Sequence, residues 1–105
     1  MLNTLEKLKR LEAYVAADDI IVNSVLDKTL TKFLTREQMR MRQLTQRLQL
    51  ELKQFEQTYH LLSQEFYIRY NQGDMSDDMD FIEWAATLEM LTNAEKRMAL
   101  LEFVQ

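Results

Sequence analysis

The chain has 105 residues with one glycine and no proline, and this composition predicts a single all-α domain. It has no cysteine, which excludes a disulfide scaffold, the usual zinc finger and a thiol nucleophile. Its formal net charge of −4 is uneven: residues 1–60 carry +2 and residues 61–105 carry −6, an asymmetry that concerns partners rather than the fold. The first ten residues are already charged and the longest aliphatic run is only Ile20 to Val22, so we expect a soluble, cytoplasmic protein with neither a signal peptide nor a membrane span.

A first helix is predicted over residues 3–17. Asn3 and Glu6 have the spacing of a capping box, in which the cap side chain accepts a backbone N–H of the first turn. Apolar residues follow at helical spacing. Asp18 and Asp19 then favour a break in the helix, since aspartate commonly caps the start of a new one.

A long helix is predicted over residues 19–61, because apolar residues step mostly by threes and fours and so lie on one face. This seam comprises Val22, Leu26, Leu30, Phe33, Met41, Leu44, Leu48, Leu52, Phe55, Tyr59 and Leu62. Thr35 to Gln38 repeats the capping-box spacing where the seam is weakest, so the sequence leaves open a break near Thr35.

Two further helices are predicted, a short one over residues 63–72 and a last one over residues 77–103. Ser63 is the expected cap of the short helix, and Gly73 is expected to end it in a left-handed conformation. Ser76 or Asp77 is the expected cap of the last helix. The buried face of that helix is predicted to hold Phe81, Trp84, Leu88, Leu91, Met98 and Leu101.

These elements predict an antiparallel hairpin or bundle with coiled-coil-like packing, forming one helical domain over residues 1–105. At 1.5 Å per residue the last helix is roughly 40 Å long and covers only part of a partner of roughly 60 Å. An apolar side stays open, lined by Leu34, Met41, Leu50, Leu61 and Ile68. We therefore expect a homodimer in which the long helices pair. Whether the first helix packs in cis or in trans is left open.

No enzymatic chemistry is predicted. Ser24, Ser63 and Ser76 have no histidine at a motif spacing, and the single His60 lies near a helix end, where a cation favours the helix dipole. Helix-bundle carboxylate metal sites use Glu-x-x-His pairs, and this sequence has none. Asp74, Ser76 and Asp78 imitate the start of a calcium loop, but Met79 and Ala85 occupy its glycine and closing glutamate positions. We expect no enzyme, metal or cofactor.

A basic stripe follows one flank of the long helix and comprises Lys28, Lys32, Arg36, Arg40 and Arg47. Such a stripe suits phosphate contacts, so nucleic-acid binding is one interpretation, although no helix-turn-helix pattern accompanies it. The favoured interpretation is a solvated face that pairs with the acidic C-terminal half of the same chain or of a second copy.

The segment from Tyr59 to Met90 holds the only glycine, tryptophan and histidine together with the densest acidic run. Its aromatic residues suit core packing at the turn, or an anchor for a partner. Its acidic residues suit helix capping, or a docking patch for a basic protein. The candidate partner-binding residues are Phe66, Tyr67, Tyr70, Asp74, Asp77, Asp80, Phe81, Glu83 and Trp84.

The stretch YHLLSQEFYIRYNQGDMSDDMDFIEW resembles small all-helical antitoxin-like proteins of prokaryotic toxin–antitoxin loci. The shared pattern is a tyrosine-containing turn, a short helix S-x-E-F-Y-x-R-Y, a glycine-plus-acid turn, and D-F-x-E-W opening the last helix. With the preceding long helix the resemblance covers about two-thirds of the chain. The sequence departs from the pattern at His60-Leu61 and at Met75-Ser76.

The resemblance implies a non-enzymatic protein that binds and neutralises a small toxin, which in such loci is often of the nuclease type. A chain whose last 45 residues carry −6 would then use carboxylates to imitate phosphate in a basic cleft. Two alternatives stay open: a structural or adaptor homodimer, and nucleic-acid binding along the basic stripe.

Overall fold

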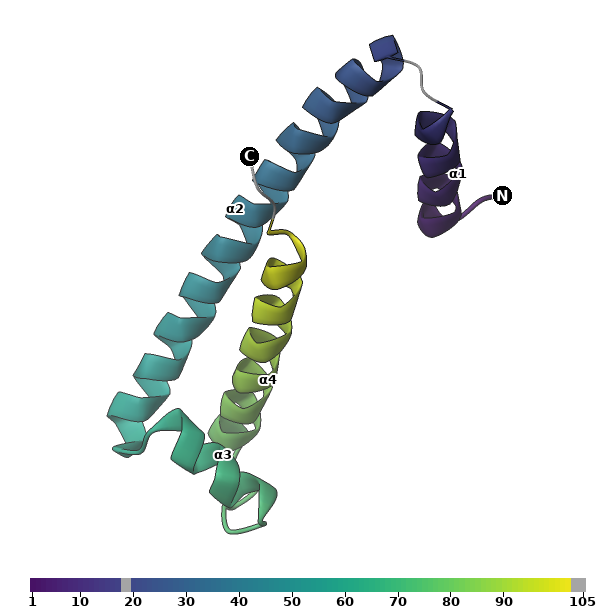
Figure 1. The fold of residues 1–105 in the computed structure, drawn as a ribbon. Helices are drawn as coiled ribbons and strands as arrows, with labels where there is room; N and C mark the ends of the chain where they lie inside the picture. Colours follow the sequence, from purple (N-terminus) through teal and green to yellow (C-terminus); the bar gives the residue numbers. More distant parts are fainter. Residues whose placement is uncertain (18–19, 103–105) are drawn as a thin grey trace. The chain divides into compact units, whose positions relative to one another are not determined.

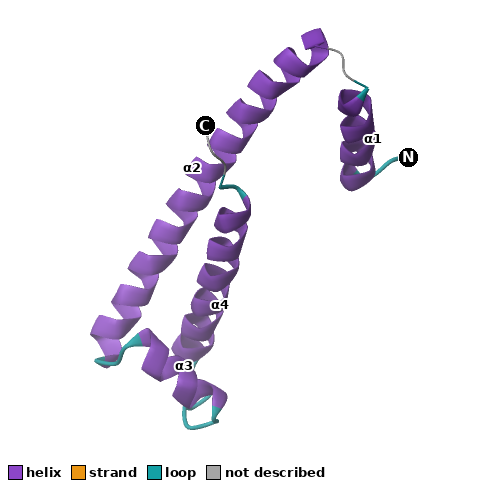
Figure 2. Cartoon of the chain, in the orientation of Figure 1, coloured by secondary structure: helices purple, strands orange, loops and turns teal. Residues whose placement is uncertain are grey.

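The computed structural model describes residues 1–17 and 20–102 (Figure 1). Four helices account for most of them: α1 (Thr4–Ala16), α2 (Ile20–Tyr59), α3 (Ser63–Asn71) and α4 (Met79–Leu100). Figure 2 shows only helices, turns and loops in this described part of the chain, with no strand. The predicted all-α class and the predicted order of four helices are confirmed.

Helix α1 begins as the capping pattern predicts, because the Asn3 side chain accepts the backbone N–H of Glu6 at 2.8 Å. It ends at Ala16, one residue before the predicted end. The predicted break at Asp18 and Asp19 lies outside the described residues.

Helix α2 runs without interruption through Thr35, so the break that the second capping pattern allowed does not form. The Gln38 side chain instead donates to the backbone carbonyl of Leu101 at 2.6 Å, which ties the end of α4 to α2. Helix α2 ends at Tyr59, two residues before the predicted end, because His60 adopts a left-handed conformation with φ of 52°. The Leu61 N–H then bonds back to the Glu56 carbonyl at 3.4 Å.

The predicted cap of α3 is wrong. Ser63 is the first residue of that helix and the preceding Leu62 supplies no side-chain cap. The carboxylate of Glu56 accepts the Ser63 backbone N–H at 2.8 Å and so takes the capping role from α2. The Ser63 hydroxyl does not cap the helix. It lies in the core and accepts a hydrogen bond from the indole N–H of Trp84.

The turn between α3 and α4 matches the prediction at its glycine but not at its cap. Gly73 has φ of +78°, the left-handed value expected where α3 ends. Helix α4 starts at Met79 rather than 77, and its cap is Asp78, whose side chain accepts the Asp80 N–H at 2.9 Å. Neither Ser76 nor Asp77 is the cap. The predicted end of α4 at 103 lies outside the described residues.

The chain divides into two compact units, Met1–Arg36 and Glu37–Gln105, where the sequence predicts one domain. Unit 1 comprises α1 and the first part of α2, and no residue in its described part is buried. Unit 2 comprises the rest of α2 with α3 and α4. Its helices form the predicted antiparallel hairpin, with α4 running back along α2 and α3 at the closed end (Figure 1).

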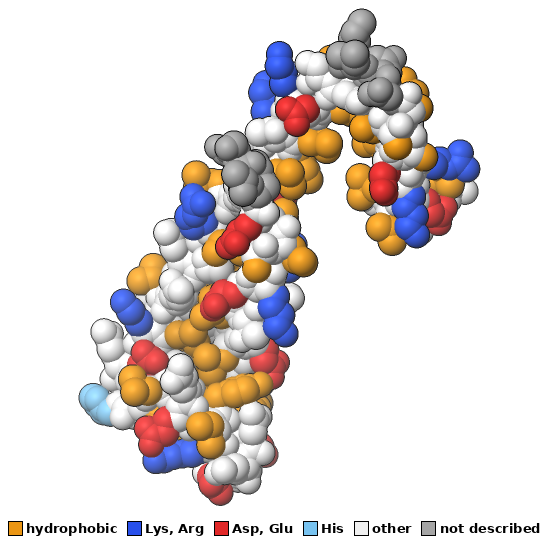
Figure 3. All heavy atoms as spheres, in the orientation of Figure 1, with side chains coloured by type: hydrophobic (Ala, Val, Ile, Leu, Met, Phe, Trp, Pro, Cys, Tyr) orange, Lys and Arg blue, Asp and Glu red, His pale blue; other side chains and the backbone are white. Residues whose placement is uncertain are grey.

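The core of unit 2 lies between α2, α3 and α4. At the closed end the buried apolar residues are Leu52, Phe66, Trp84 and Ala85; further along α2 and α4 they are Met41, Leu48 and Ala94. Figure 3 shows apolar side chains gathered along this seam on one face of the molecule.

The predicted open apolar side is partly wrong. Met41 is 2% exposed and belongs to the core, and Leu61 is half-buried against the same core. Leu50 and Ile68 are exposed as expected, and Leu34 in unit 1 is half-buried. Helical spacing also places Met41 in the apolar seam of the long helix, and its burial agrees with that assignment.

Candidate protein-binding surfaces

The aromatic residues around the α3–α4 turn form the centre of the core rather than an exposed anchor. Phe66 and Trp84 are both fully buried, and their rings stack with centroids 3.9 Å apart and planes at 3°. Phe55 of α2 also stacks on Trp84, at 5.5 Å. Because a fully buried ring cannot touch a partner, Phe66 and Trp84 are removed from the candidate partner-binding residues.

Three other predicted aromatic residues are half-buried around this stack. Tyr70 packs on Phe66 at 5.5 Å, and Phe81 packs on Tyr59 at 5.0 Å. The Tyr67 hydroxyl donates to Glu89 at 3.0 Å, which links α3 to α4. These residues have one side in the core and one side in solvent, so they are still available at the edge of a contact.

A hydrogen bond joins the end of α2 to the start of α4. The Tyr59 hydroxyl donates to the Asp80 carboxylate. This bond, with some desolvation and the negative charges of Asp80 and Asp78, raises the pKa of Tyr59 from 10.0 to about 12. Asp80 is therefore both a predicted site residue and a structural one.

The acidic turn before α4 is open to solvent. Asp74, Asp77 and Asp78 are all exposed, and within residues 1–17 and 20–102 none of them forms an ion pair. Asp78 is used as the helix cap. Asp74 and Asp77 carry charge without a structural partner in the described chain, as a docking patch would.

A groove of about 430 Å³, the acidic groove, lies between α2 and α4. Its lining consists of Glu51, Gln54, Phe55, Thr58, Asp80, Glu83 and Thr87. Three carboxylates face it and no cationic residue lines it. The fold thus brings the predicted Asp80 and Glu83 together with Glu51.

Sequence reasoning missed Glu51. It lies about 30 positions before its neighbours in the groove and belongs to no motif. The only available signal is its place one turn before Phe55 on α2. That signal becomes informative only when the register of α4 against α2 is known.

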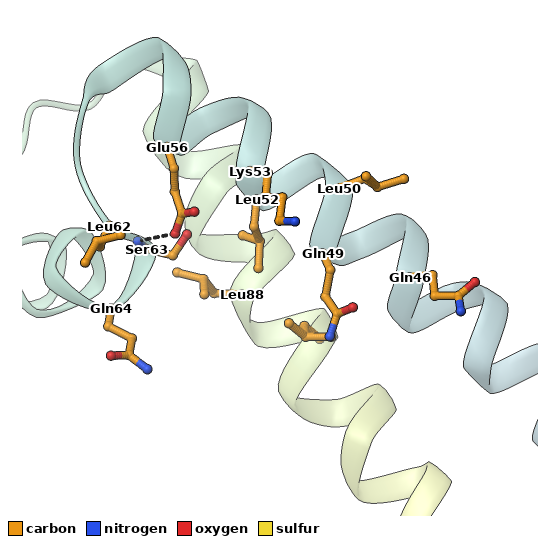
Figure 4. A pocket seen from close by; sticks show the side chains of 11 residues that line it. Gln46, Gln49, Leu50, Leu52, Lys53, Glu56, Leu62, Ser63, Gln64 and Leu88 are labelled. Carbon is orange, nitrogen blue, oxygen red and sulfur yellow. Dashed lines mark hydrogen bonds between the residues drawn. The ribbon is translucent and has the colours of Figure 1, made fainter.

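An apolar groove of about 740 Å³ lies on the other side of the α2–α4 seam (Figure 4). Its lining consists of Gln46, Gln49, Leu50, Leu52, Lys53, Glu56, Leu62, Ser63, Gln64, Leu88 and Leu91. Leu50 and Leu62 are 61% and 67% exposed. A second groove of about 630 Å³ shares Gln64 and Leu88 and continues past Tyr67 and Ile68.

The two kinds of groove are separated by α2 itself. Glu51 faces the acidic groove and Lys53 faces the apolar one. Two residues along a helix correspond to a rotation of about 200°, so these side chains point to opposite flanks. A ligand in one groove does not occupy the other, and variants can address each groove separately.

The basic stripe is exposed along its whole length but is partly neutralised. Arg40 pairs with Glu37 at 2.8 Å, and Arg47 lies 3.9 Å from Glu51. These pairs form within α2, whereas the sequence predicts pairing with the acidic C-terminal half. Lys28, Lys32 and Arg36, in unit 1, are exposed.

The described residues contain no group of three or more His, Cys, Asp or Glu side chains arranged to hold a metal ion. His60 is exposed beside the end of α2. None of the helices in residues 1–17 and 20–102 is long and apolar enough to cross a membrane.

Comparison of the chain with protein-family models, with curated proteins and with solved structures found no match in any of the three.

Proposed function

We propose that this chain is a non-enzymatic, antitoxin-like protein of the cytoplasm that binds and neutralises a small basic protein. The acidic groove carries the proposal: Glu51, Asp80 and Glu83 face one concave surface without a cation among its lining residues. Arginine and lysine side chains are the groups that such a surface attracts most strongly.

The acidic turn adds further exposed carboxylates just before α4. Asp74 and Asp77 are exposed and unpaired within the described chain, and both immediately precede α4, on which Asp80 and Glu83 lie. An excess of exposed carboxylates creates a field that speeds the approach of a basic partner. If the partner is a nuclease, the same carboxylates would occupy the positions of substrate phosphates in its cleft.

Nucleic-acid binding along the basic stripe is less well supported. Two of its five cations already have carboxylates within 4 Å. Phosphate contacts would have to compete with these neighbours, which lowers the electrostatic gain on binding.

The test begins with capture of the tagged chain's partners from native lysate after nuclease treatment. The affinity of a captured partner is then measured for the wild type, for Glu51→Gln with Glu83→Gln, and for the control Glu12→Gln with Glu102→Gln. Both double variants remove the same charge. We expect a loss of affinity of roughly two- to thirtyfold for the groove variant only, since exposed ion pairs contribute roughly 0.2–1 kcal/mol each and the variant removes two carboxylates.

The proposal also predicts that the wild-type affinity falls as salt is added, because exposed charges are screened within about 10 Å at 0.1 M salt. A third variant, Leu62→Ser, addresses the apolar groove on the opposite flank. If affinity falls with Leu62→Ser but not with the acidic-groove variant, the electrostatic mechanism is wrong. Equal losses for the groove variant and its charge-matched control would also overturn it.

A further inference from the structure

The two apolar grooves of unit 2 form one continuous surface, because they share Gln64 and Leu88. We call this surface the trough. Residues of α2 line one edge of the trough and residues of α4 line the other (Figure 4). Its exposed apolar side chains are Leu50, Leu62 and Ile68.

The charged residues that line the trough balance one another. Lys53 and Glu56 lie on the α2 edge, and Glu89 and Lys96 lie on the α4 edge. The trough therefore carries no net charge, although residues 61–105 carry −6. A strongly basic partner gains little from such a surface, so its occupant has to offer both signs of charge.

All four charges are available to a partner, since none of them forms an ion pair within the described chain. Glu56 accepts the Ser63 N–H with its Oε2 atom. Glu89 accepts the Tyr67 hydroxyl with its Oε1 atom. Each carboxylate thus keeps one oxygen, and each lysine its whole ammonium group, for a contact outside the chain.

Three contacts fix the register between the two edges. They join Gln38 to Leu101, Phe55 to Trp84 and Tyr59 to Asp80, and in each pair the two residue numbers add up to 139. By the same register Glu89 lies level with Leu50. Towards the closed end of the hairpin, the α2 edge therefore presents a lysine and then a glutamate, and so does the α4 edge.

This order of charges is complementary to itself. A two-fold rotation about an axis across the trough lays the α2 edge of one copy over the α4 edge of another and reverses its direction. The order lysine–glutamate then meets the order glutamate–lysine. An isologous interface between two identical chains requires self-complementarity of this kind.

We propose that the trough binds the trough of a second copy of this chain, about a two-fold axis at the level of Leu50. Lys53 of each copy then lies opposite Glu89 of the other, and Glu56 lies opposite Lys96. At 1.5 Å per residue, these pairs are offset along the helices by at most about 5 Å, which a lysine side chain can span. The inference does not depend on the proposed function, which uses the acidic groove on the opposite flank.

The apolar side chains obey the same symmetry. Ile68 follows Tyr67, which bonds to Glu89 at the level of Leu50, so Ile68 lies at this level on the α4 side. The rotation places Ile68 of one copy against Leu50 of the other. These side chains are 59% and 61% exposed in the single chain, and the pairing removes both from water.

Charge reversal tests the ion pairs. Lys53→Glu places a carboxylate opposite Glu89 at two symmetric positions, so we expect the dissociation constant of self-association to rise by about two- to thirtyfold in sedimentation equilibrium. Adding Glu89→Lys exchanges the signs and should tighten association again. The control Lys32→Glu makes the same change of charge at an exposed position in unit 1 and should match the wild type.

A wild-type chain that stays monomeric at about 100 μM would overturn the proposal, as would equal effects of Lys53→Glu and Lys32→Glu. A monomeric chain that loses a captured protein on Leu62→Ser would assign the trough to a different partner and would overturn it as well.

The absence of native cysteine allows a direct test of the axis. Chains with Lys53→Cys are mixed with chains with Glu89→Cys under mild oxidation. We expect the mixed disulfide to form several times faster than either homodimeric disulfide, because only the mixed pair places the two thiols at one contact. Homodimeric disulfides that form as fast as the mixed one would contradict the proposed axis.

Discussion

The buried contact between Trp84 and Ser63 joins α4 to α3. The indole N–H donates to the Ser63 hydroxyl at 2.9 Å, and Ser63 is buried while Trp84 is fully enclosed. A tryptophan that packs both faces against other rings needs one polar partner in the core, because a buried N–H without an acceptor is costly. Serine is small enough to supply that acceptor without displacing the stack.

Ser63→Ala should therefore destabilise the fold by about 1–3 kcal/mol, the usual cost of leaving a buried donor unsatisfied. Ser76→Ala, at an exposed loop position, is the matched control and should change stability by less than about 0.5 kcal/mol. Urea unfolding followed by the fluorescence of the only tryptophan measures both. Equal unfolding midpoints for the two variants would show that the hydrogen bond contributes nothing.

Tyr59 makes the fold sensitive to high pH. Its pKa rises from 10.0 to about 12 in the folded chain, chiefly through the hydrogen bond to Asp80. A raised pKa means that folding favours the protonated phenol. The stabilisation is complete below pH 10 and is lost as the pH rises from about 10 to about 12.

We expect Tyr59→Phe to be less stable than the wild type at pH 8, and the difference to shrink between about pH 10 and 12. Lysine titration affects both proteins, so their difference isolates Tyr59. Thermal unfolding across this pH range provides the measurement. A difference that stays constant with pH would mean that Tyr59 titrates in the folded chain as it does in the unfolded one.

At the scale of the elements, two left-handed residues end two helices. Gly73 does so without strain, whereas His60, with φ of 52°, does so with a side chain. The space around Gly73 is open, since an added Cβ would have no atom within 4 Å. A substitution there therefore acts through backbone strain alone.

Gly73→Ala should cost about 1–2 kcal/mol, and His60→Gly should stabilise the fold by up to about 1 kcal/mol, because only glycine adopts this conformation freely. Chemical unfolding of the two variants beside the wild type gives the comparison. A destabilising His60→Gly would indicate that the imidazole has a contact role that outweighs its strain.

The ends of the helices show which features can be predicted from neighbouring residues alone. The Asn3 cap and the Gly73 turn match the prediction, because both depend on bonds within a few residues. The cap of α3 does not match, because its carboxylate comes from Glu56 in the preceding helix. At the start of α4, the side chains of Ser76, Asp77 and Asp78 are all of a type that can cap a helix. Asp78 is the cap, because the helix begins at the next residue.

At the scale of the whole molecule, unit 2 has a closed core and unit 1 has none in its described part. Short helices in water gain most of their stability from packing an apolar face. The described residues of unit 1 bury no apolar face of this kind.

The amino-acid sequence alone determined the all-α class, the order of the four helices and the turn at Gly73. These follow from backbone preferences and from periodicities of three and four residues, which act over short distances. The exposed acidic residues Asp74 and Asp77 were also found this way, since charge is read directly from the sequence.

Only the tertiary structure decided which aromatic residues are core and which carboxylates share a groove. Phe66 and Trp84 are buried, and Glu51 joins Asp80 and Glu83, because α4 packs on α2 at one particular register. That register results from many contacts between residues 20 or more positions apart, such as Trp84 with Ser63 and Tyr59 with Asp80. No local pattern encodes such pairings, so the candidate site was predicted only in part.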